Sequence, residues 1–105
     1  MTGGFESLPQ PVAPLDLSTP GDYHVVGIGG PGMSAIAIVL AEMGHRVTGS
    51  DLREMPVLDR LRVAGATINV GHDRSVVHGV DAVTASTAIP DRNIELDEAR
   101  RIGVP

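Results

Sequence analysis

The 105-residue chain contains no cysteine, and only two of its residues are aromatic, Phe5 and Tyr23. The absence of cysteine excludes disulfide bonds, thiolate chemistry and zinc sites built on cysteine, and it is compatible with a reducing cytoplasm. With so few aromatic rings, the core must be built from aliphatic side chains. A chain of this length nevertheless suits one domain that buries roughly two thirds of its unfolded surface.

Positive charge and long apolar runs are scarce as well. The formal net charge is -5, which argues against nucleic acid or an anionic membrane as a partner, because both need a basic patch. Residues 1–20 contain no Lys or Arg and no apolar segment typical of a signal peptide. The longest purely apolar run, 35–41, is too short to span a bilayer. We therefore expect a cytoplasmic protein with no membrane or nucleic-acid partner.

The chain divides into an N-terminal tail and one domain. Four prolines, two glycines and scattered acidic residues predict a flexible tail over residues 1–20. Residues 21–105 then alternate between strand and helix patterns. We predict strands over 23–26, 46–50, 67–70 and 80–85. We predict helices over 33–43, from Pro56 to about 64, and from about 93 to 102, where Gly103 ends the last helix. This alternation predicts an α/β fold, a Rossmann-like parallel sheet of four to five strands with helices on both faces.

The helices carry further local signals. Apolar spacing places Met33 and Met43 on the core face of the first helix. In the last helix, acidic residues in the early turns and arginines in the final turn match the helix macrodipole: Glu95, Asp97 and Glu98, then Arg100 and Arg101. Three histidines lack a motif context and are interpreted as structural or solvated: His24, His45 and His78.

The chain stops at Pro105, where the alternation places a fifth strand. We therefore expect a fragment of a longer chain. A missing strand would expose an edge of the sheet, and an exposed edge favours pairing with another chain. The sequence thus predicts some tendency to form a homodimer or to aggregate.

Gly27, Gly29 and Gly32 have the GxGxxG spacing at the predicted turn from the first strand into the first helix. In such a turn the first glycine permits the tight bend, the second lets the backbone approach a pyrophosphate, and the third lets helix and strand pack closely. The phosphate binds at the positive end of the helix dipole. The loop therefore predicts binding of a nucleotide diphosphate. It lacks the Lys-Ser/Thr pair of a P-loop, so we expect no ATP hydrolysis in this domain.

Polar residues follow the other predicted strands, at the edge where open parallel sheets bind ligands. Asp51 stands 19 positions after Gly32, where an acidic residue binds a ribose hydroxyl; its alternative role is to cap a turn or a helix. His72 follows the third strand, with an ordinary surface role as its alternative. Ser86 and Thr87 follow the fourth strand and either form a turn or contact a diphosphate or sugar. The chain shows no recognisable catalytic set or metal-ligand spacing.

Together these motifs resemble the N-terminal domain of the Mur ligase family. The resemblance covers residues 23–105, and the sequence Gly30-Pro31-Gly32-Met33-Ser34 favours the branch that adds L-alanine over the branch that recycles murein peptides. The resembling segments are Gly27-Ile28-Gly29-Gly30-Pro31-Gly32-Met33-Ser34, Val47-Thr48-Gly49-Ser50-Asp51, Gly71-His72, and Ser86-Thr87-Ala88-Ile89-Pro90 with Asn93 and Glu95.

This resemblance implies that the chain binds the UDP part of UDP-N-acetylmuramate. The implied binding residues lie in the glycine loop, at the start of the first helix and after the later strands: Gly27, Gly29, Gly30, Gly32, Met33, Ser34, Ser50, Asp51, His72, Ser86, Thr87 and Ala88. The glycine loop and Ser34 would meet the diphosphate, and Asp51 with Ser50 would address the uridine. His72 and the segment after the fourth strand would complete the pocket.

The resemblance also implies an ATP-dependent ligase of cytoplasmic peptidoglycan synthesis. A central domain would bind ATP and Mg²⁺, and a C-terminal domain would help to bind L-alanine. The muramoyl carboxylate would become an acyl phosphate and then be attacked by the amine of L-alanine. Those domains are not within these 105 residues, so we expect no catalytic residue, metal or cofactor here and no activity from this chain alone.

Two other interpretations stay open on the sequence. An NAD(P)-binding domain of a dehydrogenase or a nucleotide-sensing regulator would share the glycine loop and the acidic residue after the second strand. A non-catalytic interaction module, with glycines that serve only packing, would bind no nucleotide. Gly71-His72 and the 86–90 segment favour the ligase family, because dinucleotide binding does not require them.

Overall fold

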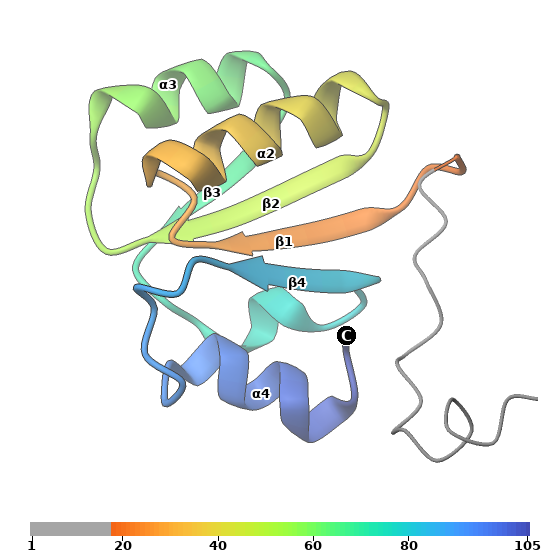
Figure 1. Cartoon of the computed structure of the whole chain (residues 1–105), viewed down its shortest axis with the longest axis vertical. Helices are drawn as coiled ribbons and strands as arrows, with labels where there is room; N and C mark the ends of the chain where they lie inside the picture. Colours follow the sequence, from red (N-terminus) through yellow and green to blue (C-terminus); the bar gives the residue numbers. More distant parts are fainter. Residues whose placement is uncertain (1–17) are drawn as a thin grey trace, which may run out of the picture.

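The computed structural model describes residues 18–105, which form one four-stranded parallel sheet with helices on both faces (Figure 1). The strands lie in the order β3-β2-β1-β4. Their bounds are β1 (Asp22–Val26), β2 (Arg46–Asp51), β3 (Thr67–Val70) and β4 (Ala82–Ala85). The predicted α/β class and Rossmann-like arrangement are confirmed. The flexible tail expected over 1–20 falls mostly on residues 1–17, outside the described residues.

Helices α2 (Pro31–Glu42) and α3 (Pro56–Val63) cover one face of the sheet (Figure 1). The opposite face carries α4 (Ile94–Ile102) and a short 3₁₀ helix, η1 (Arg74–Val77), that the sequence did not predict. The η1 turn starts because the Asp73 carboxylate accepts hydrogen bonds from both the N–H and the hydroxyl of Ser75, each at 2.8 Å. Such a local side-chain cap has no periodic signature in the sequence.

The bounds of α3 and α4 follow the prediction closely, whereas α2 begins at Pro31, two residues before its predicted start. Pro31 and Pro56 occupy the first turns of α2 and α3, where a missing N–H leaves no hydrogen bond unmade. The side chain of Asn93 caps α4 by accepting hydrogen bonds from the N–H groups of Glu95 and Leu96, at 2.8 and 3.3 Å. Gly103 ends α4 with a φ of 80°, a left-handed conformation that favours glycine.

The core between the sheet and helices α2 and α3 is aliphatic, as predicted. Its buried residues are Val25, Ile28, Ala37, Val47, Leu58, Leu61 and Ala66. Met33 packs against this cluster, but Met43 is 50% exposed, so the core position predicted for Met43 is wrong. Helix α2 is apolar on nearly all sides, and it turns the small residues Ser34 and Ala37 inward. Apolar spacing does not define the buried face of such a helix.

The chain's last residues lie beside the start of β4. The carbonyl of Pro105 accepts a hydrogen bond from the N–H of Val83 at 2.9 Å, and the N–H of Val104 donates to the carbonyl of Ala99 at 2.9 Å. This contact is at the position predicted for a fifth strand, and the expected dimer stays a prediction. Within residues 18–105, no helix combines the length and apolar character needed to cross a membrane.

Candidate functional site

A cleft of about 540 Å³ opens at the carboxyl edge of the sheet. Because the four strands are parallel, the segments that follow them meet at this edge (Figure 1). The structure brings together four of the predicted residues here, one at or beyond the carboxyl end of each strand: Gly27, Asp51, His72 and Ala88. The remaining lining residues are Leu52, Ile89, Pro90, Arg92, Asn93 and Ile94.

Hydrogen bonds to β2 hold the glycine loop in place. Gly27 has a φ of 74° and so makes the tight turn that the first glycine of the motif predicts. The N–H groups of Gly27 and Ile28 both donate to the carbonyl of Ser50, at 2.8 and 3.0 Å. The N–H of Gly29 donates to the Asp51 carboxylate at 2.8 Å. The loop is therefore fixed before any ligand arrives.

The first turn of α2 offers free hydrogen-bond donors. Among the described residues, nothing accepts a hydrogen bond from the N–H groups of Gly32 and Met33. A Cβ built on Gly32 would meet no atom within 4 Å, so the space above this turn is open. Free N–H groups at the positive end of a helix dipole bind anions. This turn is therefore suited to a phosphate group.

The third glycine of the motif does not have the packing role that its position predicts. Gly32 stands in open space, whereas Gly29 is crowded: a Cβ there would overlap the Met55 sulfur and the Asp51 carboxylate. Close packing of the loop and the strand instead depends on Gly49 in β2, where a Cβ would overlap the side chain of Ile28. Because Gly32 has no side chain, the N–H groups at the start of α2 are left accessible.

Asp51 has both a structural and a ligand-facing position. One of its carboxylate oxygens accepts from the N–H of Gly29 and the other from the N–H of Leu52, each at 2.8 Å. The capping alternative therefore describes part of what this residue does. Each carboxylate oxygen can accept a second hydrogen bond, and Asp51 lines the cleft. A ligand hydroxyl can bind to it without breaking the loop.

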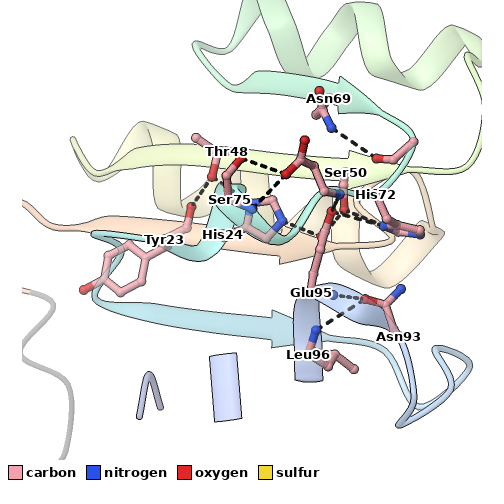
Figure 2. Close-up of polar contacts among 12 residues, drawn as sticks. Tyr23, His24, Thr48, Ser50, Asn69, His72, Ser75, Asn93, Glu95 and Leu96 are labelled. Atoms are coloured by element: carbon pink, nitrogen blue, oxygen red, sulfur yellow. Dashed lines mark hydrogen bonds and ion pairs between the residues drawn. The ribbon is translucent and has the colours of Figure 1, made fainter. Parts of the chain in front are cut away.

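A buried polar network lies on the face of the sheet that carries α4 (Figure 2). One of its members, His72, also lines the cleft. The centre of the network is the fully buried carboxylate of Glu95. Oε1 of Glu95 accepts from the hydroxyl of Ser50 at 2.6 Å and from Nε2 of His24 at 2.8 Å. Oε2 accepts from the N–H of Asp73 at 3.0 Å and is 3.3 Å from Nδ1 of His72. The network joins α4, β1 and β2 to the segment that carries His72.

The network keeps Glu95 ionised. Burial raises the pKa of this carboxyl, but hydrogen bonds from His24, Ser50 and the backbone of Asp73 outweigh burial and lower the pKa to about 2. The match to the helix macrodipole predicted that Glu95 is a charged residue in the first turn of α4. It did not predict that this charge is buried. One sequence signal could have revealed it: Thr48 and Ser50 are polar, stand two apart on a central strand and so share a face.

Several other predicted residues do not reach the cleft. Ser50 is fully buried and contacts Glu95 and His72 instead. The hydroxyl of Ser34 donates to the carbonyl of Pro31 at 3.1 Å. The hydroxyl of Ser86 accepts from the N–H of Ala88 at 3.2 Å and so forms the turn that was its alternative role. These serines shape the site from behind its surface.

Residues 89, 90 and 92–94 form much of the cleft wall, and the prediction of site residues omitted them. The resembling segments already contained Ile89, Pro90 and Asn93, which was the available signal. No sequence signal indicated Arg92, because a single exposed arginine in a loop has many ordinary roles. As the one guanidinium in the lining, it adds positive charge to the cleft.

Comparison with known proteins agrees with this geometry. The model of the family described as "Mur ligase family, catalytic domain" matches residues 22–105. A UDP-N-acetylmuramate–L-alanine ligase from Rubrobacter xylanophilus is 52% identical over 82 residues, which are 78% of this chain and 18% of the relative. The chain therefore spans about a fifth of such a protein.

Two solved structures have the same fold over most of the described residues. The UDP-N-acetylmuramate–alanine ligase of Thermotoga maritima aligns with a TM-score of 0.76 and 38% identity, over 81% of this chain and 20% of that one. A murein peptide ligase from Psychrobacter arcticus aligns with a TM-score of 0.75 and 28% identity, over 80% and 18% of the two chains. With the family model matching residues 22–105, this chain belongs to the Mur ligase family.

Proposed function

We propose that this chain is the UDP-N-acetylmuramate-binding domain of a UDP-N-acetylmuramate–L-alanine ligase. The observation that carries the proposal is the pair of free N–H groups of Gly32 and Met33, in open space at the loop whose first glycine lines the cleft. A diphosphate matches these donors, and the nucleoside can then extend toward Asp51 and His72. The 52% identity to an L-alanine ligase favours that branch of the family.

Each part of the site has a distinct role in this proposal. The glycine loop and the first turn of α2 bind the diphosphate through backbone donors, and Met33 contributes its N–H because its side chain packs on the core. Asp51 accepts a hydrogen bond from a ribose hydroxyl. His72 and the wall around Ala88 enclose the nucleoside. Ser50 acts through its contact with His72.

The complete reaction needs residues that lie outside this chain. Within residues 18–105, no group of three His, Cys, Asp or Glu side chains could hold a metal ion, and the glycine loop lacks the Lys-Ser/Thr of a P-loop. These residues therefore do not fit Mg²⁺ or the triphosphate of ATP. The matched segment is 18% of the length of the L-alanine ligase relative. We assign the binding of ATP, Mg²⁺ and L-alanine to the other four fifths of a protein of that length, and we place the reaction in the cytoplasm. This chain alone holds the nucleotide and carries out no reaction.

An NAD(P)-binding domain is the rival interpretation, and it is not favoured, because relatives at 52% and 38% identity are ligases of UDP-N-acetylmuramate. The test is a titration of the ¹⁵N-labelled chain with UDP-N-acetylmuramate, UDP and NADH, followed by amide NMR shifts. We expect saturable shifts at Gly32, Asp51 and His72 with both UDP ligands and none with NADH. Shifts with NADH alone, or a well-dispersed spectrum that no ligand changes, would contradict the proposal.

A further inference from the structure

His72 joins the buried network to the cleft. Its side chain is 14% exposed and lines the cleft, while Nδ1 faces inward, 3.2 Å from the hydroxyl oxygen of Ser50 and 3.3 Å from Oε2 of Glu95 (Figure 2). Among the described residues, nothing makes a hydrogen bond to the other ring nitrogen, Nε2. Nε2 is also not among the buried polar atoms that lack a partner. It is therefore open to solvent and to a ligand.

The surroundings of Nδ1 determine where the imidazole proton resides. Glu95 is a carboxylate and can only accept hydrogen bonds. The Ser50 hydroxyl is 2.6 Å from Oε1 of Glu95 and so must donate its proton there, which leaves the Ser50 oxygen as an acceptor toward His72. Both neighbours of Nδ1 are thus acceptors, and Nδ1 must carry a proton to bond with either. In the neutral ring, Nε2 then has no proton.

We propose that Glu95 is a positioning residue for nucleotide binding: with Ser50, it fixes His72 in the Nδ1–H tautomer, so that Nε2 faces the cleft as a hydrogen-bond acceptor. The group that Nε2 recognises is then an O–H or N–H donor of the nucleoside. A neutral His72 contributes no hydrogen bond to a phosphate oxygen. The ligand-binding part of this inference rests on the proposed function, whereas the tautomer does not.

The tautomer is measured first, on the ligand-free chain. Long-range ¹H–¹⁵N NMR correlations of the histidine rings, at a pH where His72 is neutral, report which nitrogen carries the proton; His72→Gln identifies the signals. We expect a protonated Nδ1 and an unprotonated Nε2. A proton on Nε2 would overturn the proposal, whether or not UDP binds. This measurement needs no change at Glu95 and so does not depend on the folding of a variant there.

A double-mutant cycle then tests whether Glu95 acts through His72. We expect Glu95→Gln to weaken UDP binding about tenfold when His72 is present, as coupled members of one hydrogen-bond network do, and less than about twofold in the His72→Gln background. Equal losses in both backgrounds would show a merely structural role and overturn the proposal. If the original chain binds no UDP, the proposed function fails together with the ligand-binding part of this inference, and the NMR result still decides the tautomer part.

Glu98→Gln is the matched control. Glu98 lies on the same helix and is 4% exposed, with hydrogen bonds to Arg101 and His78, each 2.6 Å at its shortest. It makes no contact with His72 among the described hydrogen bonds and ion pairs. The variant loses a nearly buried charge in α4 as Glu95→Gln does. We expect it to leave both the His72 tautomer and UDP affinity unchanged; a tenfold loss would show that any disturbance of α4 suffices.

Discussion

Ile28 packs over Gly49, in space that a side chain at position 49 would occupy. Ile28 belongs to the glycine loop, and Gly49 pairs with Val25 of β1 and Ile68 of β3 in the middle of the sheet. The loop can therefore lie close to β2 only because position 49 lacks a Cβ. From there, the N–H groups of Gly27 and Ile28 reach the carbonyl of Ser50. A glycine outside the GxGxxG motif thus helps to set the position of the motif.

Gly49→Ala is expected to destabilise the fold. The added methyl group would overlap Ile28, whose side chain is fully buried and cannot move into solvent. Overpacking of this kind costs about 1–3 kcal/mol in the free energy of unfolding. Urea unfolding followed by circular dichroism measures the loss. A variant as stable as the original chain would show that the loop can shift away from β2 at no cost.

Gly32→Ala is expected to keep or raise stability, in contrast to Gly49→Ala. The methyl group has open space around it, and replacing glycine by alanine inside a helix raises stability by up to about 1 kcal/mol. The same methyl group would stand beside the free N–H groups where the diphosphate is proposed to bind. We expect unchanged or higher thermal stability together with weaker UDP binding, measured by calorimetry. Unimpaired UDP binding would place the diphosphate elsewhere.

The sequence predicted best those features that depend on local residues. Pro56 at a helix start, Gly103 at a helix end and the glycine loop between β1 and α2 act over a few positions, so their patterns are visible along the chain. Because the strands were predicted to be parallel, their carboxyl ends could be placed together at one edge of the sheet. The predicted strand at 80–85 was two residues too long, because η1 and its connection reach position 81 before β4 begins.

Features that depend on distant residues could not be predicted in this way. The bond between His24 and Glu95 joins residues 71 positions apart, and neither residue type alone indicates burial. The outward position of Met43 depends on how α2 is rotated on the sheet, which an apolar surface on nearly all sides leaves undetermined. Arg92 joins the cleft only because the fold brings the loop before α4 to the same cleft as Gly27, which follows β1.

Arg92→Ala is expected to weaken binding of UDP but not of uridine. Within residues 18–105, no acidic side chain forms an ion pair with Arg92, so its guanidinium is available to a diphosphate. A hydrogen bond to a charged group of this kind changes affinity by about tenfold at low salt, and less as salt screens it. Calorimetry with UDP and with uridine at two salt concentrations separates the charge effect from contacts to the nucleoside.

Arg53→Ala provides the control for Arg92, because Arg53 is also exposed but does not line the cleft. It removes the same charge from the molecule, so a general effect of net charge on an anionic ligand would appear in both variants. We expect an unchanged UDP affinity for Arg53→Ala. Equal losses in the two variants, or a loss of uridine binding in Arg92→Ala, would rule out a local contact with the diphosphate.

The buried carboxylate of Glu95 predicts a specific dependence of stability on pH. Its pKa is about 2 in the folded chain against an ordinary 4.5, so the folded state binds this proton less readily than the unfolded state. The resulting stabilisation is complete above pH 4.5 and disappears as the pH falls toward 2. At 1.36 kcal/mol for each pKa unit, it amounts to roughly 3 kcal/mol.

The variant Glu95→Gln tests this dependence, because it has no carboxylate to protonate. The difference in unfolding free energy between the original chain and this variant should therefore be largest at pH 7 and shrink between pH 4.5 and pH 2.5. Urea unfolding at these pH values measures it, with Glu42→Gln at the exposed end of α2 as a control expected to differ little at any pH. A difference for Glu95→Gln that stays constant with pH would mean that the carboxyl contributes through its shape and hydrogen bonds, and that its charge is not what stabilises the network.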